Sequence, residues 1–387
     1  MEGWPWWIIL ATAALVIGQL FFALHAMRLL LGDDELPDFR PAVAPFISVV
    51  VPARNEEATI SSLLGDLRVQ DYPPDRFEVI VVDDGSTDAT RRLAEQCVGA
   101  TWRLLDLHDG FGKKAAIERA VVEARGDVVL VTDADARCGP LRLQFVARAW
   151  QRDPFDLLLM PISVATDGSW LQELQTNEQL GFMAVAAASA GGGRALIANG
   201  ANMAFRRSTF ELLSGFQRHR HIASGDDMFL LRSMQAANKT VAYVAAAEVL
   251  VSVRSEPTLS AFVHQRLRWA GKMRRGGIGI TGIIPALALM APVMLWASTL
   301  MLFTRPAERL AEDGWSVPAP IPVVVPLLLW LGWLLPIVVL AQTMGARIGQ
   351  RASSQGLAGS LVLFSIYAPI LAVLSLFLRS TWKGRRV

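Results

Sequence analysis

Four long apolar stretches constrain this chain more than any other feature of its sequence. They cover residues 6–31, 279–303, 319–344 and 357–378 of the 387. A helix crosses the hydrocarbon core of a bilayer with about 20 apolar residues, so each stretch is long enough to be a transmembrane helix. Because 52% of the residues are hydrophobic and only 19% are charged, the composition also indicates a membrane protein.

The charges beside these stretches predict the orientation of the chain. No Lys or Arg precedes residue 6, which also argues against a secretory signal. Five basic residues stand just before the second stretch: Arg266, Arg268, Lys272, Arg274 and Arg275. The positive-inside rule therefore places the chain between the first two stretches in the cytoplasm, in a multi-pass protein of the cell (inner or plasma) membrane.

The C-terminal end conflicts with four simple crossings. Such crossings would place a basic tail outside the cell, against the same rule. The tail residues concerned are Arg379, Lys383, Arg385 and Arg386. The third stretch contains four prolines, and each lacks a backbone N–H that lipid cannot replace. We therefore expect residues 319–344 to be re-entrant or broken.

A different pattern fills residues 41–257, where short β-branched runs alternate with helical stretches. The apolar runs at 46–51, 79–82, 128–132 and 157–160 are typical of strands buried on both faces. This pattern predicts an α/β domain with a parallel or mixed sheet covered by helices. The chain then divides into an N-terminal transmembrane helix and linker (1–40), the α/β domain (41–257), an amphipathic interface helix (258–278) and a C-terminal transmembrane region of about three spans (279–387).

Acidic loops follow three of these strands. Ligands of open α/β sheets bind beyond the carboxyl ends of the strands. Asp83 and Asp84 could accept hydrogen bonds from a nucleoside, and the same loop could equally be a turn that caps the next helix. Asp133 and Asp135 could hold a hard divalent cation together with substrate phosphates, with a solvated turn as the alternative.

Six motifs occur in a fixed order along the chain: VVVPARNEE, VVDDGSTD, the pair Asp133 and Asp135, NGANMAFRRSTF, SGDD and QRLRW. Together, over about residues 46–275, they closely resemble the family-2 inverting glycosyltransferases of GT-A fold, including the QxxRW signature found in membrane-bound members. The resemblance implies a nucleotide-sugar-binding, Rossmann-like catalytic domain that works with a divalent metal.

The resemblance also implies roles on the donor side. Asp83 and Asp84 would bind the uracil and ribose of a UDP-sugar, with Glu56 as a supporting contact. Asp133 and Asp135 would hold Mg²⁺ or Mn²⁺ against the diphosphate. A divalent ion at that point neutralises the charge that develops on the leaving group.

On the acceptor side, Asp227 matches the position of the general base, and Asp226 would orient it. A displacement at the anomeric carbon requires a base that takes the proton of the attacking hydroxyl. The alternative is that both residues only begin a helix.

Gln265, Arg268 and Trp269 match the QxxRW signature, whose side chains would line the acceptor and diphosphate region. An amphipathic helix at the membrane surface is the other interpretation of this segment. Asn202 lies in a segment that resembles the strand and loop beside the acceptor sugar, or it belongs to a glycine turn before a buried strand. Lys113 and Lys114 stand where the family usually has a lysine and then an asparagine. Glu118 stands near the expected asparagine, so the role of that asparagine is not carried over.

These features predict a hexosyltransferase that transfers a sugar from a nucleotide-sugar donor to a hydroxyl of a lipid-type or membrane-associated acceptor. Two alternatives remain, a processive polysaccharide synthase that secretes its product through the spans and a non-catalytic membrane scaffold. A net charge of only +2 gives no basic field for nucleic acid. Cys97 and Cys138 form neither a metal pair nor a disulfide framework.

Overall fold

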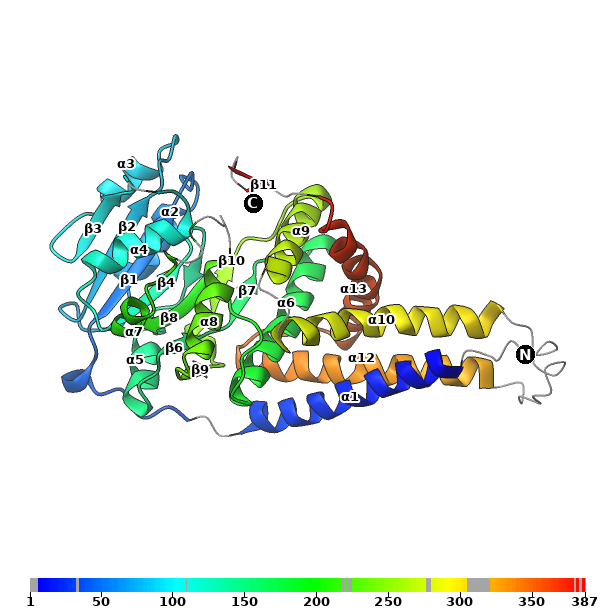
Figure 1. The fold of residues 1–387 in the computed structure, drawn as a ribbon. Helices are drawn as coiled ribbons and strands as arrows, with labels where there is room; N and C mark the ends of the chain where they lie inside the picture. The colour runs from blue at the N-terminus through cyan, green and yellow to red at the C-terminus, as the bar shows by residue number, and fades with distance from the viewer. Residues whose placement is uncertain are drawn as a thin grey trace.

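The computed structural model describes residues 6–32, 35–108, 110–217, 220, 225–275, 280–304, 321–378, 381–382 and 385–386. Within these ranges the chain forms an α/β part and a group of long helices that projects from it (Figure 1). The side chains of Lys272, Arg274, Arg275 and the tail after 378, which served to predict the orientation, lie outside the described residues.

A seven-stranded mixed sheet forms the centre of the α/β part, with the order β3-β2-β1-β4-β8-β6-β9. The first four strands in this order are parallel, whereas β8 runs antiparallel to β4 and β6. The strands are β1 (Ile47–Ala53), β2 (Phe77–Asp83), β3 (Trp102–Asp106), β4 (Val128–Thr132), β6 (Leu157–Leu159), β8 (Asn202–Arg206) and β9 (Val241–Tyr243). The four predicted strands correspond to β1, β2, β4 and β6, and the α/β class is confirmed.

Helices cover both faces of this sheet, and the alternation along β1 shows how. Val49 and Val51 belong to the core shared with α2 and α5, whereas Val50 belongs to the core shared with α4 and α8. All three side chains are fully buried, as expected for strands covered on both sides. The covering helices are α2 (Ile60–Arg68), α3 (Thr90–Glu95), α4 (Lys113–Glu123), α5 (Arg142–Arg152), α7 (Arg207–Leu212) and α8 (Asp226–Ala236).

A second sheet, with the order β5-β10-β7, lies between the large sheet and the long helices (Figure 1). It consists of β5 (Arg137–Cys138), β7 (Ile162–Val164) and β10 (Val251–Val253), and short 3₁₀ turns occur at Pro41–Val43 and Ala247–Val249. Helix α6 (Trp170–Gly191) packs on β7 and also against the long helices, and α9 (Leu259–Arg275) follows β10. This layer joins the two parts of the molecule.

Four apolar helices make up the projecting part: α1 (Trp6–Leu31), α10 (Ile280–Thr304), α12 (Ile321–Arg347) and α13 (Ser354–Leu374). Within the described residues, three segments are long and apolar enough to cross a membrane by length and composition: Trp7–Leu31, Val324–Arg347 and Ser354–Leu374. Helix α10 contributes a shorter apolar segment, Leu289–Met301. The segment is shorter than the helix because the side chains at both ends of α10 lie outside the described residues. A short hairpin of β11 (Thr381–Trp382) and β12 (Arg385–Arg386) follows α13.

The expectation that the third stretch is broken is wrong, because α12 is one continuous helix with Pro326 and Pro336 inside it. A proline lacks the N–H that would bond to the carbonyl four residues earlier, which is Gly332 for Pro336, and it disturbs the carbonyls of the preceding turn. A neighbouring helix can bond to carbonyls in such a turn. Here Gln19 of α1 donates to the carbonyl of Trp333, with an N–O distance of 2.8 Å. The close packing of α1 on Gly332, where an added Cβ would lie 2.8 Å from Val16, places that donor within reach.

A buried carboxylate holds the edge of the large sheet together. Glu78 of β2 is fully buried and accepts hydrogen bonds from Ser48 Oγ (2.7 Å), Arg103 (2.7 Å) and the backbone and side chain of Arg125 (2.7 and 3.0 Å). Burial raises the pKa of Glu78, but these hydrogen bonds and the charge of Arg103 outweigh it and hold the pKa below its usual range. The carboxylate therefore stabilises the fold in its ionised form.

Replacing Glu78 by Gln should cost about 2 kcal/mol of the free energy of unfolding, or about 5 °C in the thermal midpoint of a domain of this size. Since the folded pKa is lowered, the advantage of the wild type should be complete above about pH 4.3 and disappear as the pH falls through the folded value. Thermal unfolding in detergent at pH 7 and at decreasing pH measures both effects. Glu123→Gln, which removes a half-exposed carboxylate paired with Arg119, is the control and should change the midpoint by less than 1 °C.

Candidate active site

Two loops at the carboxyl edge of the large sheet are joined by hydrogen bonds. Asn55, after β1, donates its backbone N–H to Ser86 Oγ (3.0 Å) and accepts from the N–H of Thr87 (2.9 Å). Asn55 adopts a left-handed backbone with φ of +52°, a conformation that asparagine tolerates well. Glu56 donates its N–H to Thr90 Oγ1 (2.6 Å). The loop predicted to support a nucleotide is thus fixed to the loop predicted to bind it.

Asp83 and Asp84 lie at the end of β2 and are both buried, with exposures of 5% and 7%. The carboxylate of Asp83 accepts from the N–H of Ser86 (3.2 Å). Asp84 accepts from the N–H of Gly112 (3.1 Å), and the Arg54 guanidinium lies 3.8 Å from its carboxylate. These contacts hold the two acidic side chains at the sheet edge.

Lys113 joins the other acidic loops. Its Nζ lies 2.6 Å from Oδ1 of Asp133, after β4, and 3.2 Å from Oδ2 of Asp226, at the start of α8. It also donates to the carbonyl of Gly200 (3.0 Å). Burial lowers the pKa of Lys113, but Asp133, Asp226 and Asp227 raise it by more, so the pKa lies above its ordinary value. The ammonium therefore stays charged and holds the carboxylates together.

The segment of Gly112 and Lys113 thus contacts three of the predicted acidic side chains. The backbone of Gly112 binds Asp84, and the side chain of the next residue binds Asp133 and Asp226. Gly112 has a φ of +85°, which favours glycine and lets α4 begin at Lys113. The loops after β2 and β4, which the sequence places at the same edge of the sheet, are joined through this segment, and the start of α8 meets them there.

Two glycines allow the close approach of α8. Gly225, just before α8, has a φ of +95°. Gly200 lies so close to the acidic cluster that an added Cβ would be 2.5 Å from Oδ2 of Asp226 and 2.8 Å from Nζ of Lys113. Asp226 is buried, whereas Asp227 is partly exposed and accepts from the N–H of Met228 (2.8 Å). Asp227 is therefore the more accessible carboxylate of the pair.

The residues after β4 were predicted to hold a divalent cation, and their chemistry fits one. Among the described residues, no group of three or more His, Cys, Asp or Glu side chains converges as a complete metal site. Magnesium in nucleotide sites is commonly bound by one or two carboxylates together with substrate phosphates, so Asp133 and Asp135 suffice on the protein side. Asp133 also lies 2.6 Å from Nζ of Lys113, so a cation held there would share this carboxylate with the ammonium.

Helix α9 carries the three residues of the QxxRW signature. Gln265 donates to Glu256 (2.8 Å), and Trp269 packs edge-on against Phe182 of α6 with 6.3 Å between the ring centroids. Burial lowers the pKa of Arg268, and the carboxylates of Glu256 and Asp133 oppose this effect. The charge of Arg268 is therefore felt at the metal loop, whereas Gln265 and Trp269 contact the protein interior.

Arg266 fixes α9 from its other side. It binds Oε2 of Glu178 on α6 at 2.6 Å, and its guanidinium lies over the rings of Trp269 (4.2 Å) and Phe262 (4.5 Å). Tyr367 of α13 also hydrogen-bonds to Glu178. One buried carboxylate thus connects α6, α9 and α13.

Asn202 occupies a structural position. Its side chain is 1% exposed, accepts two hydrogen bonds from Arg142 (2.8 and 3.2 Å), and donates to the carbonyls of Pro161 and Val249 (both 2.7 Å). An amide has two donors and two acceptor sites, so none is left for a ligand in this arrangement. The predicted substrate contact of Asn202 stays a prediction, and this geometry does not favour it.

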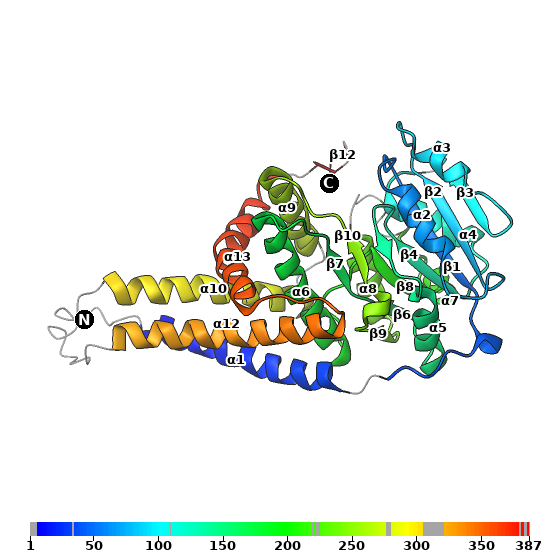
Figure 2. The same cartoon turned by 180° about the vertical axis from the view of Figure 1, so that it is seen from behind.

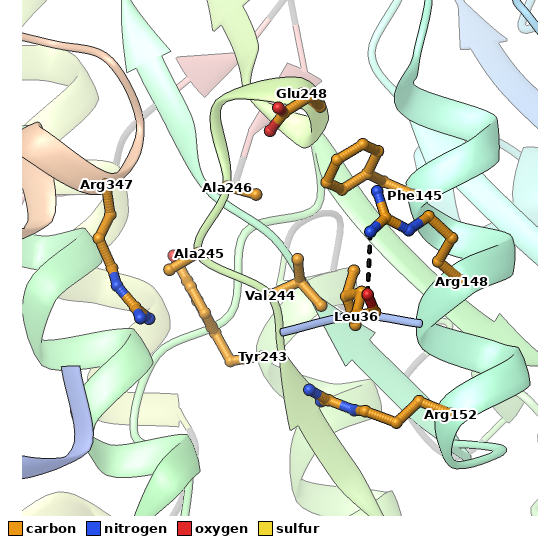
Figure 3. Close-up of a pocket in the computed structure, with 10 residues that line it drawn as sticks. All are labelled: Leu36, Phe145, Arg148, Arg152, Tyr243, Val244, Ala245, Ala246, Glu248 and Arg347. Atoms are coloured by element: carbon orange, nitrogen blue, oxygen red, sulfur yellow. Dashed lines mark hydrogen bonds between the residues drawn. The ribbon is translucent and has the colours of Figure 1, made fainter. Parts of the chain in front are cut away.

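A cavity of about 220 Å³ lies away from the acidic cluster. Arg148, Arg152 and Arg347 line it together with Tyr243 and Glu248 (Figure 3). Arg148 donates to the carbonyls of Leu36 and Pro37, and Arg347 donates to the carbonyl of Gly32. Two of its arginines therefore anchor the linker between α1 and β1.

Sequence reasoning missed the roles of Lys113, Gly200 and Arg266. A lysine at the start of a helix carries no local signal of its partners, which lie 20 and 113 positions away along the chain. The NGAN segment did hint at Gly200, because a glycine between two asparagines often permits a close approach of the backbone. Arg266 entered the sequence analysis only as one of the basic residues that predict the orientation of the chain.

The comparisons agree with this geometry. Residues 48–213 match the family model described as glycosyl transferase family 2. The β-monoglucosyldiacylglycerol synthase of Synechocystis sp. is 32% identical over 177 residues, which are 42% of this chain and 36% of that protein. The dodecaprenyl-phosphate galacturonate synthase of Rhizobium johnstonii is 33% identical over 132 residues, covering 33% of this chain and 39% of that protein. Less than half of the chain thus matches the family model, and the chain spans less than half the length of these two relatives.

A solved mannosyltransferase of Pyrobaculum calidifontis, in complex with GDP-Man and Mn²⁺, resembles the whole structure. The two share 22% identity and a TM-score of 0.55, over 96% of this chain and 98% of the other. The likeness confirms the GT-A fold predicted from the motifs.

Replacing Lys113 by Met should tighten the binding of Mn²⁺ in the absence of nucleotide by about tenfold. The substitution removes one positive charge beside Asp133, and a change of about 1.4 kcal/mol in the attraction of a divalent ion is tenfold in affinity. Electron paramagnetic resonance of free Mn²⁺ measures the constant. Lys113→Arg keeps the charge and is the control. If the Met variant bound Mn²⁺ as weakly as the wild type or more weakly, the main effect of Lys113 would be to position Asp133 and not to repel the cation.

Proposed function

We propose that the family 2 domain of this chain is the catalytic domain of an inverting glycosyltransferase of the hexosyltransferase class. It transfers a sugar from a nucleotide-sugar donor, a UDP-sugar by family resemblance, to a hydroxyl of a lipid-type or membrane-associated acceptor. One observation carries the proposal: the segment of Gly112 and Lys113 contacts Asp84, Asp133 and Asp226 at once. The acidic residues proposed to bind the donor (Asp84), hold the metal (Asp133) and orient the base (Asp226) would thereby share one edge of the sheet.

The donor nucleotide would bind between the two joined loops. Asp83 and Asp84 stand at the end of β2 and accept from the N–H groups of Ser86 and Gly112, and Glu56 is tied to the same loop through Thr90. Buried carboxylate oxygens in fixed positions can accept hydrogen bonds from the N–H groups of a base and the hydroxyl groups of a ribose. The diphosphate would then lie toward Asp135 and Arg268, whose guanidinium can bind phosphate oxygens in a forked geometry.

Asp227 would act as the general base. It is the accessible member of the acidic pair and lies at the start of α8, where its backbone is fixed by Gly225. A base must reach the attacking hydroxyl directly, whereas Asp226, which is buried against Lys113, would hold the orientation. A single direct displacement by the acceptor hydroxyl inverts the anomeric carbon.

Asp135, with Asp133 beside it, would hold a divalent cation together with the donor diphosphate. When bound, Mg²⁺ or Mn²⁺ supplies charge stabilisation for the leaving nucleoside diphosphate. The ammonium of Lys113 bonds to both Asp133 and Asp226 and offsets the repulsion between their carboxylates. It would therefore preserve the geometry of both sides of the site.

The membrane would deliver the acceptor. Helix α9, with Gln265, Arg268 and Trp269, lies between the α/β part and the apolar helices (Figure 1). The names of the relatives include a glucosyldiacylglycerol synthase and prenyl-phosphate sugar transferases, which supports a lipid acceptor. We propose that residues 41–257 form the cytoplasmic catalytic domain of a multi-pass protein, since nucleotide sugars are made in the cytoplasm.

A processive synthase is a weaker alternative. The contact between α1, α10 and α12 is filled by Val16, Leu295 and Trp333, and Thr12 bonds to Ser298 across it (2.9 Å). Packed side chains there favour anchoring over a polysaccharide channel. The length of the reaction product distinguishes the two functions.

Asp227→Asn should lower turnover by at least 100-fold, because it removes the base, without changing the affinity for nucleoside diphosphate. The test uses purified full-length protein in detergent with Mn²⁺, membrane-lipid extract and a panel of UDP- and GDP-sugars, and follows the release of nucleoside diphosphate. Asp153→Asn, at an exposed carboxylate after α5, is the matched control. Turnover of the Asn variant at the wild-type rate would remove Asp227 as the base. Absence of turnover with every donor would favour the scaffold.

Gly200→Ala should reduce turnover by about tenfold or more while the protein stays folded, since the new methyl would displace Asp226 and Lys113 and a small misplacement of catalytic groups is costly. Gly139→Ala, where an added Cβ meets nothing within 4 Å, controls for the loss of a glycine. Turnover and thermal unfolding are measured on both variants. Equal activity of the two would mean that the approach at Gly200 is not needed for catalysis.

A further inference from the structure

Helix α13 runs in a different direction from the other long helices. α1, α10 and α12 lie side by side along one axis, and α13 runs across that axis beside α6 and α9 (Figure 1, Figure 2). Transmembrane helices tilt by about 0–40° from the bilayer normal. If α1, α10 and α12 cross a bilayer, α13 does not cross it with them.

The inner face of α13 is attached to the protein through polar contacts. Ser360 bonds to Asn177 of α6 (3.1 Å), and Ser365 bonds to Trp296 of α10 (3.0 Å). Tyr367 hydrogen-bonds to Glu178 and packs edge-on against Phe262 of α9. These contacts reach α6, α9 and α10 together, so the direction of α13 is fixed by three partners.

The outer face of α13 is apolar and exposed. Large side chains on this face and in the turn after it are between 38% and 77% exposed: Leu363, Ile366, Ile370, Val373, Leu374, Leu376, Phe377 and Leu378. Residues 354–378 contain no Asp, Glu, Lys or Arg. A continuous apolar surface of this kind on a folded protein indicates a partner, and a lipid tail satisfies it without any polar contact.

The chain after α13 returns toward the α/β part. In both views β11 and β12 are drawn on the α9 side of α13, away from the far ends of the long helices (Figure 1, Figure 2). The sequence there is basic, with Arg379, Lys383, Arg385 and Arg386. Basic segments stay on the cytoplasmic side, so the position of the hairpin and the charge of the tail agree.

We propose that the chain crosses the membrane three times, through α1, α10 and α12, and that α13 lies in the plane of the cytoplasmic leaflet with its outer face against the acyl chains. This arrangement rests on the membrane orientation of the proposed function and not on the transfer reaction. It removes the conflict of four crossings, because three crossings leave the basic tail in the cytoplasm. It also joins the leaflet to α9, since Tyr367 of the in-plane helix and Arg266 share Glu178.

Labelling of single cysteines tests the side of the tail. Full-length protein with Cys97→Ala and Cys138→Ala is expressed with one further substitution, and spheroplasts are treated with a membrane-impermeant maleimide. Lys383→Cys should be labelled only after permeabilisation, and Asp313→Cys, between α10 and α12, should be labelled without it. Asp153→Cys in the catalytic domain is the internal control. Labelling of Lys383→Cys in intact spheroplasts with Asp153→Cys protected would show a fourth crossing and overturn the proposal. Labelling of Asp153→Cys would instead overturn the orientation in the proposed function.

The depth of α13 is a second and independent measurement. Nitroxides are attached in liposomes at Leu363→Cys, Ile366→Cys, Ile370→Cys and Leu374→Cys, and their relative accessibility to oxygen and a nickel chelate gives depth. An in-plane helix should place all four within a few ångströms of one depth. A crossing helix would spread them over about 16 Å, which would sink the proposal. Leu327→Cys, Leu331→Cys and Leu335→Cys on α12 supply the graded profile for comparison.

Discussion

The acidic edge of the sheet depends on one ammonium group, that of Lys113. Asp133, Asp226 and Asp227 all act on the pKa of Lys113, and carboxylates this close would repel one another without a positive charge among them. Lys113 sits directly after Gly112, whose backbone binds Asp84. The start of α4 therefore sets the relative positions of the loops after β2 and β4 and of α8. The loops proposed to bind the donor and the helix that carries the proposed base are therefore positioned by the same segment.

Another buried ion pair, between Glu178 and Arg266, holds helices together next to the apolar helices. Glu178 binds Arg266 of α9 and Tyr367 of α13, and breaking a buried pair by removing one partner costs several kcal/mol. The helix that carries Arg268 and Trp269 is thus fixed to α6 from one side and to the apolar α13 from the other. The active-site edge and the lipid-facing surface are connected through a short chain of direct contacts.

Much of the fold follows from local sequence. β1, β2, β4 and β6 are predictable because their apolar runs are bounded by polar loops, and the convergence of Asp83, Asp84 and Asp133 follows from where parallel strands end. Other features depend on distant residues. Asn202 is saturated by Arg142, 60 positions earlier, and the NGAN motif contains no sign of that partner. Lys113 shows the same limit, because its role depends on residues that only the folded sheet brings near.

The apolar helices show what hydropathy can and cannot predict. Hydropathy measures the length and polarity of a segment, and by these properties α13 resembles α1 and α12. The direction of α13 is set by polar side chains that interrupt its apolar pattern. These side chains bond to α6 and α10, and they are Ser360, Ser365 and Tyr367. The prolines of α12 misled in the opposite way, because the helix continues through both of them, and a donor from α1 binds a carbonyl in the turn before Pro336. Sparse polar groups on apolar helices therefore carry more information about topology than the apolar residues around them.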